Sequence, residues 1–576
     1  GHTQRPWLVP LSATEASPFG PSSQGWRISE VQDAKAKVNA ETSNGEADET
    51  VICHVAADGF EERMVPFPVP SGSYRDLAVV KDGVVWIEVA DRGGELGATR
   101  AGVTGEAPSD VLWHYNLSAR HLDKLCERVD TFSVSGDGER LVVRHRDDTI
   151  VVPSSHKVDD DDPAYIRVDL TRLRRTVNPR AEWRQMFDEN GRLMASHYWR
   201  EDMNGVDWDS VLNRYRPLVD LCHVVDDLHD ILWETVAELN TSHSYVSASG
   251  AAGDSDMRAG LLGADVSSGN DGAKVVRVIP GESSDPRAWS PLRAAGVAVT
   301  EGDVIVAVDG RKVGADGNLG ELLEGSAGRV VELTVRRGEN ERQVAVVPMA
   351  DEAPLRYHDW VASRRRYVEE HSGGRLGYLH VPDMVSDGWA ELHRQIGEAT
   401  RHEGVIADVR FNHGGHTSQL VVERLARRVV GWDYSRWYAT ADTYPQNAVR
   451  GPIVMVTNQW AGSDGDIVAA ATQAMGYAKV IGERSWGGVV GIDGRFDLVD
   501  GTSVTQPRYA GWYGSYGWGV ENHGVDPDIV VTVSPEDWEA DRDVQLDAAI
   551  AECLRQLDDK PAATAPELPG PAFDRC

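Results

Sequence analysis

The stretch Ile453–Asp466, IVMVTNQWAGSDGD, contains the features that decide the fold of the last part of the chain. Its β-branched beginning at Ile453–Val456 is typical of a buried strand, and Gly462–Gly465 opens a segment rich in alanine that predicts a helix. Ser463 would then lie at a strand-to-helix turn, beside N–H groups that can stabilise an oxyanion. Ser463 is therefore a candidate nucleophile, although the local pattern alone favours an ordinary N-cap serine.

Strands and helices alternate on both sides of this stretch. Apolar runs at Leu376–Val381 and Val405–Phe411 predict two further strands, and Asp387–His402 between them has its apolar residues on one helical face. A series of this kind predicts a mostly parallel sheet. Because functional loops lie at the carboxyl ends of such strands, Asn412–Gly415 is a second segment of interest.

Three regions with other patterns precede this α/β region. Alternating strands with aspartyl-glycyl turns between Val51 and Val152 predict about three or four propeller blades, the tail of a larger propeller whose beginning is not in this chain. Apolar residues spaced by three and four between Ile166 and Asn240 predict a small helical bundle. The run AGVAVTEGDVIVAVDGRKV at 295–313 closely resembles a PDZ domain, which would bind a peptide as an added strand or serve only as a spacer.

Charge and hydropathy exclude several classes of partner. The 576 residues carry a net charge of −33, whereas binding to nucleic-acid phosphates needs basic patches. No apolar run approaches the roughly 18 residues of a membrane span, and no ligand cluster has the spacing of a metal site. The five cysteines are widely spaced and the N-terminus lacks a signal-peptide pattern. We therefore predict a cytoplasmic protein without cofactor, metal, nucleic-acid or membrane partners.

A nucleophilic serine needs a general base. Lysine is one candidate, but the segment Glu483–Gly488 looks like the one in which C-terminal processing peptidases carry a lysine, and the matching position here is Gly488. Histidine is the usual alternative. Among the 18 histidines, His243 stands out because it lies in the motif TSHSY at the end of the helical region.

Several separated motifs, in this order, resemble the C-terminal half of tricorn proteases. They are AEWRQMFD (181–188), GVDWD (205–209), ELNTSHSY (238–245), GLLGAD (260–265), the PDZ run, DVRFNHGG (408–415), AGSDGD (461–466) and ENHGVDPD (521–528). The resemblance implies a multidomain fold with partial β-propeller blades at 1–157, a helical bundle that carries the catalytic histidine at 158–252 and a PDZ-like domain at 253–352. A crotonase-like α/β serine-peptidase domain with a mostly parallel sheet would occupy 353–576.

The resemblance also implies a catalytic tetrad and an oxyanion hole. In the tetrad, Ser463 is the nucleophile, His243 is the general base, and Ser242 and Glu521 orient the imidazole. The oxyanion hole would be formed by backbone N–H groups of the glycine-rich loop and of the residue after the nucleophile, namely those of Gly415 or Gly414 and of Asp464.

Other parts of the resemblance concern the substrate. Asp433 is the expected match to the aspartate that gives the family its preference for a basic P1 side chain. His413, Ser244 and His416 depart from the family pattern, and a second histidine near the site could change its pKa profile. The family's N-terminal propellers, which guide peptides, are not contained in this chain.

The function that follows is a serine peptidase for oligopeptides, acting downstream of the proteasome with a preference for basic or hydrophobic P1 residues. Peptides would be its partners, and the resemblance implies a homo-oligomer, a hexameric ring in the family. Two alternatives remain. One is a C-terminal processing peptidase, and the other is a non-catalytic scaffold that binds peptides through the PDZ module and the propeller blades.

Overall fold

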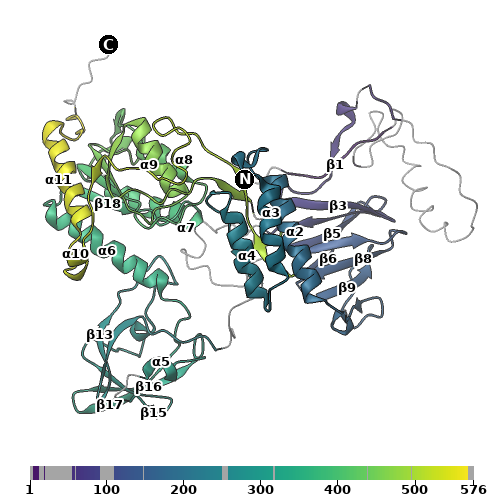
Figure 1. Ribbon diagram of the computed structural model, residues 1–576, viewed down its shortest axis with the longest axis horizontal. Coiled ribbons are helices and arrows are strands. Elements are labelled where there is room, and N and C mark those ends of the chain that lie inside the picture. The colour runs from purple at the N-terminus through teal and green to yellow at the C-terminus, as the bar shows by residue number, and fades with distance from the viewer. Residues whose placement is uncertain are drawn as a thin grey trace, which may run out of the picture. The chain divides into compact units, whose positions relative to one another are not determined.

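The computed structural model describes residues 4–11, 19, 55–58, 60–90, 109–146, 148–174, 176–248, 257–314, 318–437, 439–493 and 496–568 (Figure 1). The chain divides into two compact units. The first ends at Thr176, and the second runs from Val177 onward. Each unit is described by itself below.

The first unit contains two four-stranded antiparallel sheets, each with the form of a propeller blade. The strands of the first are β3 (Tyr74–Val80), β4 (Gly83–Glu88), β5 (Val111–Asn116) and β6 (His121–Glu127). Those of the second are β7 (Thr131–Val134), β8 (Arg140–His145), β9 (Asp148–Pro153) and β10 (Ile166–Arg167).

The described part of the blade region forms two such sheets. Much of 12–54 together with 91–108 lies outside the described residues, so three or four blades stay a prediction. The second sheet extends past residue 157, because Ile166 pairs with Val151 across β10 and β9. Two paired residues are too short a strand for a periodic pattern, so the sequence could not indicate them.

Three helices begin the second unit: α2 (Pro179–His197), α3 (Trp208–Val219) and α4 (Val225–Ala237), which Figure 1 shows side by side. Their buried core includes Phe187, Leu193 and Leu232, and it is joined by Leu498 and Val504, from the region around β25 (Ser503–Val504). Strand β11 (Val246–Ser247) then pairs with β25. The bundle is therefore joined to the C-terminal region directly after the TSHSY motif.

The PDZ-like domain is a six-stranded antiparallel sheet. Its strands are β12 (Ala264–Gly269), β13 (Gly272–Val278), β14 (Val304–Val308), β15 (Arg311–Lys312), β16 (Val331–Arg337) and β17 (Asn340–Val346), and it includes the short helix α5 (Leu319–Leu322). The domain has its own core, in which Val275, Ile305, Leu333 and Val335 are fully buried.

A five-stranded sheet organises the C-terminal domain, and it is parallel throughout where a mostly parallel sheet was predicted. Its order is β18 (Leu376–His380), β19 (Gly404–Asp408), β22 (Ile453–Thr457), β23 (Ala478–Gly482) and β27 (Ile529–Val530). One face packs on α7 (Ser386–Ala399), α8 (Ser418–Leu425) and α9 (Asp464–Met475), and the other on α6 (Ala353–His371) and α11 (Val544–Asp559). Loops at the carboxyl edge follow β19 and β22, where sequence reasoning placed the candidate site.

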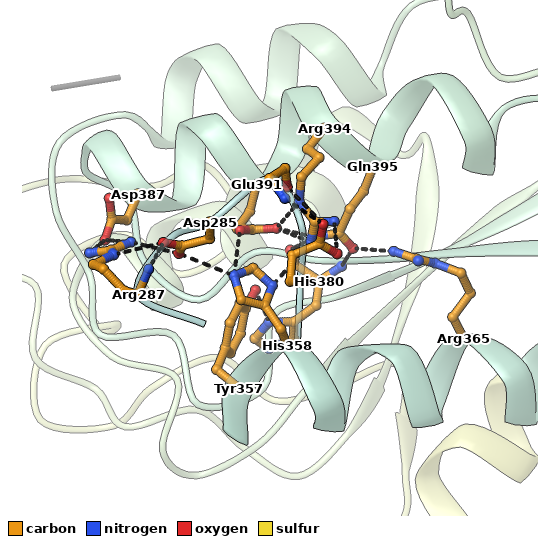
Figure 2. Close-up of polar contacts among 12 residues, drawn as sticks. Asp285, Arg287, Tyr357, His358, Arg365, His380, Asp387, Glu391, Arg394 and Gln395 are labelled. Carbon is orange, nitrogen blue, oxygen red and sulfur yellow. Dashed lines mark hydrogen bonds and ion pairs between the residues drawn. The ribbon is translucent and has the colours of Figure 1, made fainter. Parts of the chain in front are cut away.

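A buried polar network ties the PDZ-like domain to this α/β domain (Figure 2). His358 of α6 points between two carboxylates, with Nε2 3.3 Å from Asp285 and 3.8 Å from Glu391. Arg287, which follows Asp285 on the same PDZ loop, donates to Asp285 and reaches Asp387 at the start of α7. Because Asp285 and Glu391 are almost completely buried, the network holds the PDZ loop against α6 and α7.

Replacing Asp285 by alanine should lower the free energy of unfolding by about 3 kcal/mol, because His358 and Arg287 would lose a buried partner. Burial alone would raise the pKa of Asp285, but hydrogen bonds, that of the Arg287 guanidinium foremost, lower it to about 2 from 3.8. The contribution of the Asp285 carboxylate to the free energy of unfolding is therefore complete above pH 3.8 and is lost as the pH falls toward 2. Urea denaturation at pH 7 and pH 3 measures both effects. The exposed Asp271→Ala is the control, and an equal loss in both variants would contradict the account.

Candidate active site

Ser463 occupies the strand-to-helix turn between β22 and α9. It is the N-cap of α9, with φ 58° and ψ −118°, a conformation that is strained for a residue with a side chain. An ordinary N-cap serine would accept a hydrogen bond from a helix N–H, but Ser463 makes no such bond. The strained backbone and the uncommitted hydroxyl both distinguish Ser463 from a purely structural cap.

The glycine-rich loop after β19 lies against this serine. A Cβ atom at Gly414, whose φ is +77°, would come within 2.6 Å of the Cβ of Ser463, so only glycine fits there. The N–H of Gly414 donates to Oδ1 of Asn412 at 2.9 Å. By contrast, the N–H groups of Gly415 and Asp464 have no acceptor among the residues that the structure describes. Of the two glycines that sequence reasoning left open, Gly415 is thus the one with a free donor.

His243 lies in the turn after α4 and is linked to Ser242 and Glu521. Its Nδ1 is 3.0 Å from the hydroxyl of Ser242, which donates to Oε2 of Glu521 at 3.0 Å. The Ser242 N–H also donates to Oε1 of Glu521 at 2.7 Å. Because the Ser242 proton points to the carboxylate, its oxygen accepts from Nδ1–H of His243. This assigns the neutral tautomer in which Nε2 of His243 is an acceptor.

Backbone donors hold the Glu521 carboxylate in place. The N–H groups of Val489 and Val490 donate to Oε2 of Glu521 at 2.8 and 3.0 Å. Sequence reasoning missed both residues, since a backbone donor can be any residue type and leaves no signal in the side-chain pattern.

Asp466 was a second omission, although it lies in the quoted AGSDGD motif. Its buried carboxylate accepts from the Ser485 hydroxyl and from the N–H of Gly487 at 2.8 Å, and burial raises its pKa to about 6. It thereby fixes the loop that carries Trp486.

Burial also determines the charge of His243. Desolvation lowers its pKa below the ordinary value of 6.5, and the nearby charge of Glu521 opposes this shift only in part. The imidazole is therefore neutral at pH 7, as a general base must be.

Trp486 lies beside both His243 and the turn of Ser463. Its ring centroid is 5.5 Å from that of His243, and a Cβ atom at Gly462 would lie 2.7 Å from the indole. Within the described part of the chain, no hydrogen bond joins the imidazole to the Ser463 hydroxyl. Catalytic hydrogen bonds are often long in ligand-free sites and tighten with substrate.

The remaining residues of interest lie away from these contacts. Asp433 is exposed at the end of β20 (Gly431–Asp433), opposite Asp442 of β21 (Asp442–Tyr444). Among the described residues, no hydrogen bond or ion pair connects Asp433 to Ser463 or to the glycine-rich loop. The side chain of His413 is exposed, while the N–H of His416 donates to the Met384 carbonyl at 2.7 Å and so helps to anchor the loop.

In the ranges that the structure describes, no helix is long and apolar enough to cross a lipid bilayer. In the same ranges, no three histidine, cysteine, aspartate or glutamate side chains form a group that could hold a metal ion.

Three family models match parts of the chain. Residues 179–237 match the tricorn protease C1 domain, 260–351 match the tricorn protease PDZ domain, and 375–531 match peptidase family S41. These segments coincide with the helices, the six-stranded sheet and the parallel sheet described above.

Individual proteins agree with these models. Tricorn protease homolog 1 of Streptomyces coelicolor is 53% identical, over 98% of this chain and 52% of its own length. Tricorn protease of Thermoplasma acidophilum is 34% identical, over 86% of this chain and 46% of its own length. A crystal structure of the tricorn protease superposes with a TM-score of 0.81 at 31% identity, over 96% of this chain and 51% of that one. The chain thus spans about half the length of these relatives.

Proposed function

We propose that the chain is a serine peptidase that hydrolyses oligopeptides, because parts of it match the tricorn protease C1 domain, the tricorn protease PDZ domain and peptidase family S41. The observation that carries this proposal is the chain of hydrogen bonds from Glu521 through Ser242 to His243, which leaves Nε2 of a neutral imidazole free to accept a proton. The hydroxyl of Ser463, which makes no cap hydrogen bond, supplies the nucleophile.

The proposed mechanism follows from these groups. Nε2 of His243 takes the proton of Ser463 as its oxygen attacks the peptide carbonyl, and the N–H groups of Gly415 and Asp464 stabilise the resulting oxyanion. The imidazolium then protonates the leaving amine. Water hydrolyses the acyl-enzyme by the same route, with His243 again as the base. Glu521 stabilises the imidazolium through Ser242 in both steps.

Several finer features belong to the same proposal. Asp433 would favour a basic P1 side chain, with hydrophobic residues also accepted, and the enzyme would act in the cytosol on peptides released by the proteasome. A homo-oligomer, by resemblance a hexameric ring, would be its assembled form. Hydrolysis of short fluorogenic peptides that contain arginine or lysine tests the proposal. We expect turnover that persists in the presence of a chelator, whereas no turnover of any peptide in such a set would contradict it.

The pH dependence of kcat/KM should report on His243. Because burial lowers the pKa of His243, the acidic limb of the profile should have its midpoint below pH 6.5. Below that midpoint the imidazole is protonated and cannot accept the Ser463 proton, so the rate falls as the pH falls. Initial rates between pH 4 and 8 measure the midpoint. A midpoint clearly above 6.5 would show that His243 is not the buried base described here.

A further inference from the structure

A cavity of about 540 Å³ opens at the carboxyl edge of the parallel sheet, on the face covered by α6 and α11. We call it the aromatic cavity. Four aromatic side chains line it: Trp360 of α6, Phe411 after β19, Trp460 after β22, and Trp538 of α10 (Pro535–Glu539). Ser463 and α9 lie on the other face of the same sheet. The cavity and the candidate active site thus share the loops after β19 and β22.

The aromatic rings are unusually open to solvent. Trp538 is 79% exposed and Trp460 63%, and Phe411 is 40% exposed although its φ of 59° is costly for a side chain. Trp360 meets Phe411 edge to face with 6.2 Å between ring centroids. Neighbouring exposed aromatic residues around a concavity mark a binding site rather than a core.

The arginines at the cavity are already neutralised. The buried Arg410 is held by Asp408 and Asp543 at 2.7 and 2.8 Å. Arg364 and Arg542 are less buried than Arg410 and are also paired. Arg364 lies 3.1 Å from Asp543, and Arg542 lies 2.7 Å from Asp537. None of these cations is left to attract an anionic ligand.

Two carboxylates of the cavity have no cationic partner among the described residues, Glu483 and Asp541. Glu483 follows β23 and makes only a 3.5 Å contact with Gln545, and burial raises its pKa. Asp541 is exposed in the turn after α10. The charge left uncompensated in the cavity is therefore negative.

Aromatic faces together with unpaired carboxylates are the chemistry that recognises a cation. We propose that the aromatic cavity binds a lysine or arginine side chain of a peptide, with Trp460 and Glu483 as its main contacts. Trp460 and Ser463 are three residues apart, so their Cα atoms are at most about 11 Å apart. An extended peptide covers that span with three or four residues. The cavity would thus select a basic residue some positions from the scissile bond, which deepens the proposed peptidase function.

Binding to the inactive Ser463→Ala protein tests the cavity without any cleavage, so that failure of the peptidase proposal and failure of this one can be told apart. The probes are acetyl-arginine amide and acetyl-citrulline amide, which have nearly the same shape and differ in charge. We expect calorimetry to show roughly tenfold tighter binding of the arginine probe. Adding Glu483→Gln or Trp460→Leu should abolish that preference, and Asp541→Asn should weaken it. Adding Asp271→Asn should leave it unchanged, because the exposed Asp271 lies in the PDZ-like domain and does not line the cavity.

Equal binding of the two probes would overturn the proposal, as would a preference that survives Glu483→Gln but disappears in Asp433→Asn. The thermal unfolding midpoints of the variants must match that of the Ser463→Ala protein, and the exposed Asp541 provides a test even if Trp460→Leu unfolds. The alternative occupant of the cavity is a second copy of the chain, and light scattering of the Trp538→Ala variant tests for it. A change in oligomeric state with unchanged probe binding would assign the cavity to a contact between copies of the chain and would also overturn the proposal.

Discussion

Replacing Ser463 by alanine is expected to lower kcat for peptide hydrolysis by at least about 10³-fold, and His243→Ala should do the same. The first change removes the attacking oxygen. The second removes the imidazole that takes its proton in the proposed mechanism. Because the two residues act as a unit, the double variant should be no slower than either single variant.

Two controls go with this prediction: a check that every variant is folded, and the substitution of an unrelated histidine. His393→Ala changes an exposed histidine of α7 that contacts Trp389 and should retain full activity. Circular dichroism and the unfolding midpoint should be unchanged in all four proteins. Normal turnover in Ser463→Ala would contradict the assignment of the nucleophile, and additive losses in the double variant would contradict a shared proton-transfer step.

Glu521→Gln should lower kcat by about 10²- to 10⁴-fold, the second-largest expected effect. The carboxylate accepts four hydrogen bonds, from the Ser242 N–H and hydroxyl and from the N–H groups of Val489 and Val490. The nitrogen of a glutamine amide cannot accept a hydrogen bond, so the amide cannot replace the carboxylate in all four bonds. The Ser242 hydroxyl would then turn, and His243 would lose its orientation. Ser242→Ala removes only the hydroxyl and should cost less, about 10- to 100-fold.

The pH profile separates this role from simple loss of structure. The charge of Glu521 raises the pKa of His243, so Glu521→Gln should move the acidic limb of kcat/KM to lower pH while the maximum rate falls. Glu539→Gln, an exposed change on α10, should move neither. A large loss of activity with an unmoved acidic limb would mean that Glu521 only supports the fold.

The α/β part of this fold follows from local pattern. The β-branched run at Ile453–Val456 and the alanine-rich segment after Ser463 are long enough for their periodicity to define a strand and a helix, and the structure has β22 and α9 there. The blade region is less predictable, because β10 is only two residues long and its pairing with β9 is set by tertiary contacts.

The candidate site is a different case. Ser463 can be proposed from its own neighbourhood, but His243 lies 220 residues earlier, and no spacing rule connects them. The family resemblance supplied that pairing. Val489, Val490 and Trp486 contribute through backbone donors and a ring contact that local sequence does not encode. The same holds for His358 and Asp285, whose contact joins two domains.

In the proposed mechanism His243 activates Ser463, and covalent labelling with a fluorophosphonate probe tests this activation most directly. An activated serine reacts with such a probe, whereas an ordinary N-cap hydroxyl does not. Peptide mapping by mass spectrometry should find the label on Ser463 in the unmodified protein and at most a trace in His243→Ala. Absence of label on Ser463, or equal labelling in the two proteins, would contradict it.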